Sequence, residues 1–148
     1  MTGDNTKLVV ERRVAASPAT VFSFFADRDQ WLRWQGVEAE LDPRPGGIFR
    51  MNVRGDGFAS GHFVEIEPDR RIVFTWGWEM PGNPVAPGSS TVEIDLIPDG
   101  GETIVRLIHR DLPPEALEVH RQGWERYIGR LVSRAAGIDP GPDPAVLT

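Results

Sequence analysis

The sequence predicts an α+β fold in which a curved antiparallel sheet wraps around one long C-terminal helix. Between Gly36 and Arg110, segments of strand length alternate apolar and polar side chains and are separated by glycine and proline clusters. This pattern is typical of an antiparallel sheet with one solvated face. After Pro113 the apolar spacing becomes helical. A twisted sheet curls and a lone helix fills only part of its concave side, so we expect a cavity between them.

The chain before the sheet predicts one strand and two short helices. Residues 7–16 carry several β-branched side chains and predict a first strand. Ser17 is a suitable N-cap and Pro18 suits the first helical position, so a helix should begin there and end near Asp27. A second short helix is expected over residues 29–35.

The middle of the chain predicts strands joined by tight turns and one long loop. Residues 48–54, 91–98 and 102–110 each alternate apolar with polar side chains. Residues 71–79 begin with an almost continuous apolar run, which indicates a central strand. Residues 81–88 are too rich in proline and glycine for regular structure, so they predict a loop that forms a mobile rim.

The end of the chain predicts a helix and a tail. The helix should cover residues 114–136 and stop at Gly137. Residues 138–148 are rich in proline and aspartate and predict a flexible tail. No repeat is visible, so we expect a single domain over residues 1–137.

Composition excludes several classes of function. The chain has 148 residues, no cysteine and a net charge of −6. The charge argues against a nucleic-acid partner, and the absence of cysteine excludes disulfides and thiolate metal sites. Apolar runs are far shorter than the ~20 residues of a bilayer span, and the first residues lack the features of a secretory signal. We therefore expect a cytoplasmic protein without membrane insertion.

Six segments, taken in order, are similar to a known family. They are residues 14–22 (VAASPATVF), 31–34 (WLRW), 44–47 (RPGG), 61–68 (GHFVEIEP), 71–76 (RIVFTW) and 120–124 (HRQGW). The last segment resembles the His-x-x-Gly-Trp signature on the final helix of the family. On these residues the chain resembles, from about Leu8 to Gly137, the activator of heat-shock-protein-90 ATPase homologue family. That family belongs to the START-like, Bet v 1-like or SRPBCC superfamily of helix-grip folds.

The resemblance implies a cavity that accepts a small apolar or aromatic molecule. Members of the superfamily include lipid carriers, polyketide cyclases and aromatases, plant hormone receptors and co-chaperones, so the fold does not fix the function. The eukaryotic co-chaperones usually carry a further N-terminal domain, which these 148 residues lack. A chaperone-activating role is therefore the least favoured of these expectations.

The candidate ligand-binding residues are mostly aromatic, as expected of an apolar pocket with few polar groups. They are Trp31, Trp34, Phe49, Met51, Phe63, Trp76, Trp78, Met80, Leu107, His109, His120, Trp124 and Tyr127. His120 and Trp124 are four residues apart, so both should lie on one face of the last helix.

The histidines are the candidate catalytic residues. His109 and His120 could each act as a general acid or base, and His120 could instead fix the helix by bonding to a backbone carbonyl. With His62 they lie on three separate elements, so we expect no metal site. We expect no serine to have a histidine nearby, and no serine lies in a Gly-x-Ser-x-Gly turn. No cofactor is expected.

Three hypotheses follow, in order of preference. The first is a binding protein for a small apolar or aromatic molecule without chemistry of its own. The second is a cyclase-, aromatase- or hydrolase-like enzyme that uses His109 or His120. The third is an interaction module that stimulates a chaperone ATPase. A homodimer is a further expectation, with residues 81–88 or the tail at the contact.

Overall fold

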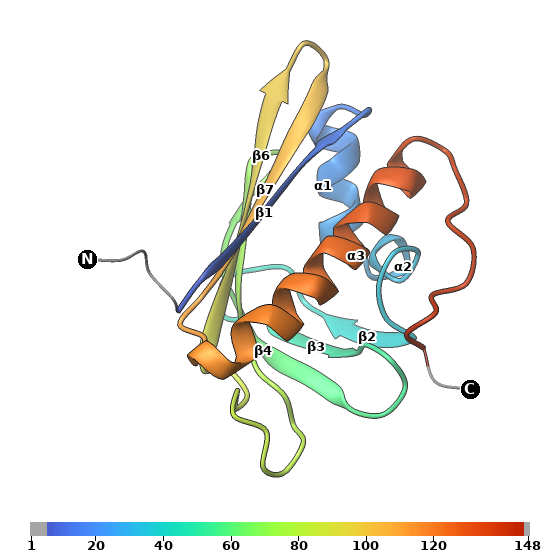
Figure 1. Ribbon diagram of the computed structural model, residues 1–148. Coiled ribbons are helices and arrows are strands. Elements are labelled where there is room, and N and C mark those ends of the chain that lie inside the picture. Colours follow the sequence, from blue (N-terminus) through green and yellow to red (C-terminus); the bar gives the residue numbers. More distant parts are fainter. Residues whose placement is uncertain (1–5, 147–148) are drawn as a thin grey trace.

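The computed structural model describes residues 6–146, and within them the strands form one seven-stranded antiparallel sheet in the order β1-β7-β6-β5-β4-β3-β2. The strands are β1 (Leu8–Val14), β2 (Glu38–Leu41), β3 (Ile48–Asn52), β4 (Phe58–Glu67), β5 (Arg71–Trp76), β6 (Ser90–Asp99) and β7 (Glu102–Arg110). The helices are α1 (Pro18–Ala26), α2 (Arg28–Trp31), the 3₁₀ turn η1 (Pro114–Ala116) and α3 (Leu117–Ala135). The curved sheet and the long C-terminal helix confirm the predicted fold class. Figure 1 shows α3 crossing the concave side of the sheet diagonally.

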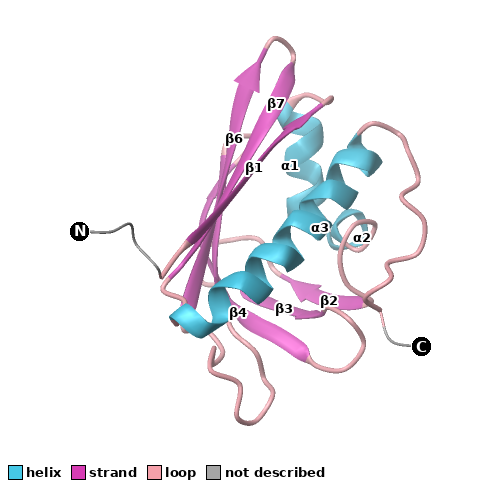
Figure 2. Ribbon diagram, viewed as in Figure 1, coloured by secondary structure: helices cyan, strands magenta, loops and turns pink. Residues whose placement is uncertain are grey.

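The two short helices are set by their caps. The Ser17 hydroxyl accepts a hydrogen bond from the backbone N–H of Thr20 at 3.3 Å, as expected for an N-cap. Asp27 ends α1 and also caps α2, because its carboxylate accepts from the N–H of Gln30 at 3.0 Å. The second helix therefore begins at Arg28 and ends at Trp31, earlier than the predicted 29–35. Figure 2 shows both helices on the same side of the sheet as α3.

The strand predicted to be central is the middle strand of the sheet. It is β5, with β6 on one side and β4 on the other. It ends at Trp76 rather than at residue 79, because the next residue lies against another segment. A Cβ atom on Gly77 would stand 1.6 Å from the carbonyl oxygen of Ala86. Residues 81–88 thus fold back onto the end of β5 and bury Val85 completely. The predicted mobility of this loop stays a prediction.

The last helix packs closely on the sheet over its second half. Ile128 and Leu131 are fully buried there and belong to the hydrophobic core. The helix ends at Ala135, and Gly137 adopts a positive φ of 79° that favours glycine. None of the helices within residues 6–146 is long and apolar enough to cross a bilayer.

The chain after Gly137 runs back along α3, as the red segment of Figure 1 shows. Arg130 donates to the carbonyl of Gly141 at 3.0 Å, and Arg134 lies 3.5 Å from the carboxylate of Asp139. The flexibility predicted for residues 138–148 stays a prediction, and residues 147–148 lie outside the described part. Residues 1–5, at the start of the segment that lacks secretory features, lie outside it as well.

Candidate ligand-binding site

A cavity of about 380 Å³ lies between the first half of α3, the end of β5 and the connections that follow β3 and β5. Its larger apolar lining residues are Val53, Trp76, Trp78, Met80, Trp124 and Tyr127. Its polar lining residues are Gln35, Arg54, Asn83, Glu115, His120, Gln122 and Arg126. Trp76 is 2% exposed while Val119, also in the wall, is 65% exposed. The cavity therefore runs from the core to the surface and is open to solvent.

Helical spacing explains the wall that α3 contributes. Ala116, Val119, Gly123 and Arg126 recur at three- and four-residue intervals and all line the cavity. Gly123 is the gap in this wall, because a Cβ atom built on it meets no atom within 4 Å. A glycine inside a helix costs about 1 kcal/mol relative to alanine. Here it leaves open space on the cavity side of the helix.

His120 is held at the cavity by both of its ring nitrogens. Nδ1 lies 2.8 Å from the backbone carbonyl oxygen of Ala116, one turn earlier. Nε2 accepts the indole N–H of Trp78 at 3.1 Å. An indole nitrogen can only donate, so Nε2 carries no proton and Nδ1 donates to the carbonyl. The carbonyl bond expected from the sequence is therefore present, and it orients His120 toward Trp78.

His109 lies behind His120 and is completely buried. The two rings meet edge to face with their centroids 5.2 Å apart. Nδ1 of His109 accepts the indole N–H of Trp124 at 3.0 Å, so Nε2 carries the proton and donates to the Ser90 hydroxyl at 2.8 Å. That hydroxyl in turn donates to the carbonyl of Trp76 at 2.8 Å.

The contact between Ser90 and His109 corrects the expectation that no serine has a histidine nearby. The residues are 19 positions apart in the sequence, and the antiparallel register of β6 and β7 brings them together. The direction of the hydrogen bonds is opposite to that of a nucleophile and its base, because the histidine donates to the serine. Ser90 is also 1% exposed. The pair is a buried structural bond.

Both histidines are neutral in this arrangement. Burial lowers the pKa of His109 well below its ordinary value, and the nearby His120 lowers it further. Burial also lowers the pKa of His120, and the bond to the Ala116 carbonyl offsets part of that effect. All four ring nitrogens are engaged with protein groups, so neither ring has a free nitrogen with which to exchange a proton with a guest.

The indole Nε1 of Trp76 is buried and has no hydrogen-bond partner within residues 6–146. The buried hydroxyl of Tyr127 lies beside the Asp143 carboxylate. Burial raises the pKa of the Tyr127 phenol, and the adjacent Asp143 carboxylate raises it further. A buried donor without a partner costs roughly 1–3 kcal/mol, so the Trp76 N–H destabilises this part of the core.

The sequence model of the family described as "Activator of Hsp90 ATPase homolog 1-like protein" matches residues 15–136. The chain belongs to this family. The human activator of 90 kDa heat shock protein ATPase homolog 1 is 29% identical over 132 residues, which cover 88% of this chain and 37% of that protein. The chain thus spans rather more than a third of the length of the curated relatives it matches.

Solved structures of the activator-homolog-like family and its neighbours share the helix-grip fold. An AHSA1-like protein from Rhizobium etli is 46% identical with a TM-score of 0.71, covering 96% of this chain and 90% of that one. CalU16 from Micromonospora echinospora is 30% identical with a TM-score of 0.75, covering 92% and 77% respectively. DynU16, encoded in the dynemicin biosynthetic locus, is 22% identical with a TM-score of 0.77, covering 93% and 49%, and supports the fold alone.

Six of the thirteen predicted ligand-binding residues line the cavity of this family member. They are Trp76, Trp78, Met80, His120, Trp124 and Tyr127. The other seven are fully buried and do not line it: Trp31, Trp34, Phe49, Met51, Phe63, Leu107 and His109. Among these, His109 faces the same side of β7 as Leu107, as the alternation predicts. Their contact with a ligand stays a prediction.

Four of the buried rings form part of what we call the closed cluster, which consists of Phe25, Trp31, Trp34, Phe49, Phe63 and Phe74. Trp31 stacks on Trp34 with centroids 5.3 Å apart, and Phe49 stacks on Phe74 at 4.3 Å. These contacts fill the space beneath α1 and α2. The cavity therefore lies at one end of the concave face.

Sequence reasoning missed several residues of the cavity. Gln35 is 3% exposed and accepts the Trp31 indole N–H at 2.9 Å while lining the wall. Arg54 and Arg126 also line it. Gly123 and Arg126 are three residues apart and share one face of α3. Trp124, two residues before Arg126, lies on a different face of the helix, so the inward position of Trp124 did not indicate that Arg126 lines the cavity. Gln35 lies in a turn, where no periodicity indicates which way a side chain points.

The third histidine lies apart from the site. His62 is exposed on β4, and its Nδ1 is 3.3 Å from the Thr75 hydroxyl. Within residues 6–146, no three histidine, aspartate or glutamate side chains are grouped closely enough to hold a metal ion.

Proposed function

We propose that this protein binds a small apolar or aromatic molecule in the cavity beside α3. The observation that carries the proposal is an open space of about 380 Å³ walled by three tryptophans and one tyrosine. Ligand pockets commonly have volumes of 300–1,000 Å³ and apolar walls with few polar groups. Aromatic rings offer a guest a large contact area at low cost in side-chain entropy.

The hydrogen-bond network supports binding over acid–base catalysis by the histidines. His109 and His120 hold Trp124 and Trp78 in place, and each uses both ring nitrogens to do so. A general base needs a free lone pair within hydrogen-bond reach of its substrate. A cyclase- or hydrolase-like reaction through these rings would first require the network to open. We therefore place the enzymatic alternative second.

Gly123 and Gly129 provide a matched test of binding. Both lie inside α3, and a Cβ atom on either one meets no neighbour within 4 Å, but only Gly123 lines the cavity. Gly123→Leu should fill the cavity mouth, whereas Gly129→Leu should not. Native mass spectrometry of the purified protein identifies a bound molecule, and tryptophan fluorescence titration then measures its affinity.

The expected result is at least a ten-fold loss of affinity in Gly123→Leu and unchanged affinity in Gly129→Leu. Equal affinity in the two variants would place the ligand elsewhere. If no molecule co-purifies and no member of a panel of lipids and polyketides changes the fluorescence, the proposal fails.

A second candidate function is stimulation of a chaperone ATPase, favoured by the 29% identity to the human activator over 88% of this chain. Because the chain matches 37% of that protein, the activity is a proposal here. Addition of the purified chain to a 90 kDa heat shock protein should raise ATP turnover if the candidate is right, and unchanged turnover would remove it.

The cytoplasmic location and the homodimer stay predictions as well. Cell fractionation checks the first. Size-exclusion chromatography with light scattering checks the second, because a monomer and a dimer of this 16.4 kDa chain differ two-fold in mass.

A further inference from the structure

We propose that the cavity selects a guest with a carboxylate on its aromatic or apolar body, and that Arg126 and Arg54 at the cavity wall recognise this group. The proposal rests on the proposed function, since it names the chemistry of the ligand for the same cavity. It is argued from the balance of donors, acceptors and charges around the space.

The charged lining is mostly cationic although the chain as a whole is acidic. Arg54 and Arg126 line the cavity and Glu115 is the acidic residue in the lining, whereas the complete chain has a net charge of −6. Arg126 and Glu115 lie eleven residues apart, about three helical turns. One end of the cavity is therefore basic, and the other end carries the carboxylate.

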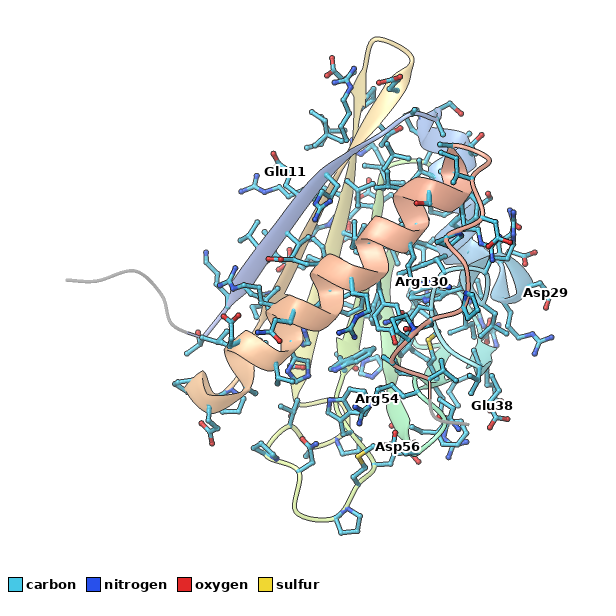
Figure 3. All side chains as sticks on the ribbon, turned by 45° about the vertical axis from the view of Figure 1, so that its right-hand side comes forward. Glu11, Asp29, Glu38, Arg54, Asp56 and Arg130 are labelled. Atoms are coloured by element: carbon cyan, nitrogen blue, oxygen red, sulfur yellow. The ribbon has the colours of Figure 1, made fainter. Side chains whose placement is uncertain are left out.

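Arg126 is the stronger of the two candidate contacts. It forms no ion pair or hydrogen bond with another residue in the described range 6–146, so its guanidinium is free to bind a guest. Arg54 shares its charge with Asp56, which lies 3.0 Å away. Figure 3 shows Arg54 and Asp56 below α3, on the chain that follows β3. A guanidinium can form two parallel hydrogen bonds to one carboxylate, a geometry that an amine or amide guest cannot match.

The inner wall lacks a free acceptor for a cation. Both ring nitrogens of His120 are occupied by protein groups. Tyr127 has the Asp143 carboxylate beside it, but Asp143 does not line the cavity. Aromatic walls alone could also favour a cation through its attraction to the ring faces. Arg126 opposes that preference by repelling a cation, and Arg54 adds less because Asp56 offsets its charge.

The test uses three probes with the same ring and different end groups. They are 1-naphthaleneacetic acid, its amide, and 2-(1-naphthyl)ethylamine, titrated by tryptophan fluorescence and checked by calorimetry. The acid should bind at least ten-fold more tightly than the amide, and the amine should bind most weakly. The preference for the acid should fall as salt is added, because the guanidinium at the mouth is exposed to solvent.

Arg126→Gln should abolish the preference of the acid over the amide and leave the affinity of the amide unchanged. The matched control is Arg121→Gln on the same helix, since Arg121 lies 3.6 Å from Glu118 and does not line the cavity. Arg54→Gln should reduce the preference less, because Asp56 already offsets its charge.

The outcomes separate this proposal from the proposed function. Equal binding of all three probes, tighter binding of the amine, or an unchanged acid-to-amide ratio in Arg126→Gln overturns the carboxylate preference and leaves the cavity as a binding site. Failure of all three probes to bind overturns both.

Discussion

The two groups of tryptophans satisfy their indole N–H groups in different ways. In the closed cluster, Trp31 donates to the side chain of Gln35 and Trp34 donates to the backbone carbonyl of Phe24, four and ten residues away. At the cavity, Trp78 and Trp124 donate to histidines on other elements, 42 and 15 residues away. Trp76 has no partner within the described residues.

The two groups also differ in packing: the closed cluster is tightly packed, whereas Trp76, Trp78 and Trp124 border an open space. Local partners hold Trp31 and Trp34 stacked with centroids 5.3 Å apart, and the strand residues Phe49 and Phe74 stack beside them at 4.3 Å. Distant histidine partners instead fix Trp78 and Trp124 by their edges, in tilted and edge-on contacts with Trp76. The centroids of Trp78 and Trp124 each lie 5.3 Å from that of Trp76, and all three rings line the cavity.

Removal of a ring from the closed cluster should have the largest effect on stability. Phe74→Ala would remove a fully buried ring that contacts Phe49, Trp31 and Phe63. We expect a loss of about 3–5 kcal/mol in the free energy of unfolding, measured by urea denaturation. The same change at Trp78, which is only partly buried, should cost less. A larger loss of unfolding free energy at Trp78 than at Phe74 would contradict the distinction between the closed cluster and the cavity tryptophans.

Loss of the inner histidine should have the next largest effect. His109→Phe keeps a ring in place but removes both hydrogen bonds of the imidazole. The Trp124 N–H loses its acceptor, and the Ser90 hydroxyl oxygen loses the N–H that donates to it. We expect a loss of about 2–3 kcal/mol, since unpaired buried polar groups cost roughly 1–3 kcal/mol each. His62→Phe, at an exposed position, is the control and should change stability by less than about 0.5 kcal/mol.

Low pH should destabilise the folded protein through protonation of His109 and His120. The pKa values of His109 and His120 are lowered in the folded protein, so below the ordinary value of about 6.5 the unfolded chain binds protons that the folded chain does not. The free energy of unfolding should therefore fall as the pH drops from about 7 toward 5, by at most about 1.4 kcal/mol per pH unit for each histidine. In His109→Phe this slope should be smaller, and an identical slope would show that the ring is not held neutral.

Replacement of either glycine inside α3 by alanine should have the smallest effect on the free energy of unfolding. Gly123→Ala and Gly129→Ala both remove backbone freedom from the unfolded chain, and both place the methyl group in open space. Each should raise the free energy of unfolding by about 0.5–1 kcal/mol. Thermal denaturation would check this, and destabilisation by Gly123→Ala alone would indicate that the cavity wall closes in solution.

The fold was more predictable than the site for a physical reason. Alternation in strands such as β6 and β7 and the helical spacing of Trp124, Ile128 and Leu131 are local signals, and they placed the sheet and α3 within a few residues. The length of α2 depended on which residue Asp27 caps, and the end of β5 depended on the approach of Ala86 to Gly77. The Asp27 cap is a local contact made three residues along the chain, whereas the approach of Ala86 to Gly77 joins residues nine positions apart and follows from no local pattern.

The site depended on choices among aromatic residues that look alike in sequence. Nothing near Trp31 or Trp76 indicates that the first is packed in a filled core and the second lines a space. The packing of residues distant in sequence decides it, as in the contact of Trp76 with Trp124. His120, Gly123 and Trp124 of the signature at residues 120–124 line the cavity, and their contact with a ligand stays a prediction.

Trp78 links the loop of residues 81–88 to the first turn of α3. Its backbone N–H donates to the carbonyl of Val85 at 2.7 Å, and its indole N–H donates to His120 at 3.1 Å. A displacement of residues 81–88 would therefore pull on the first turn of α3, and a guest that shifts His120 would in turn disturb that loop. Trp78 thus couples residues 81–88 to α3. Binding of a guest in the cavity would therefore change the conformation of this loop at the surface.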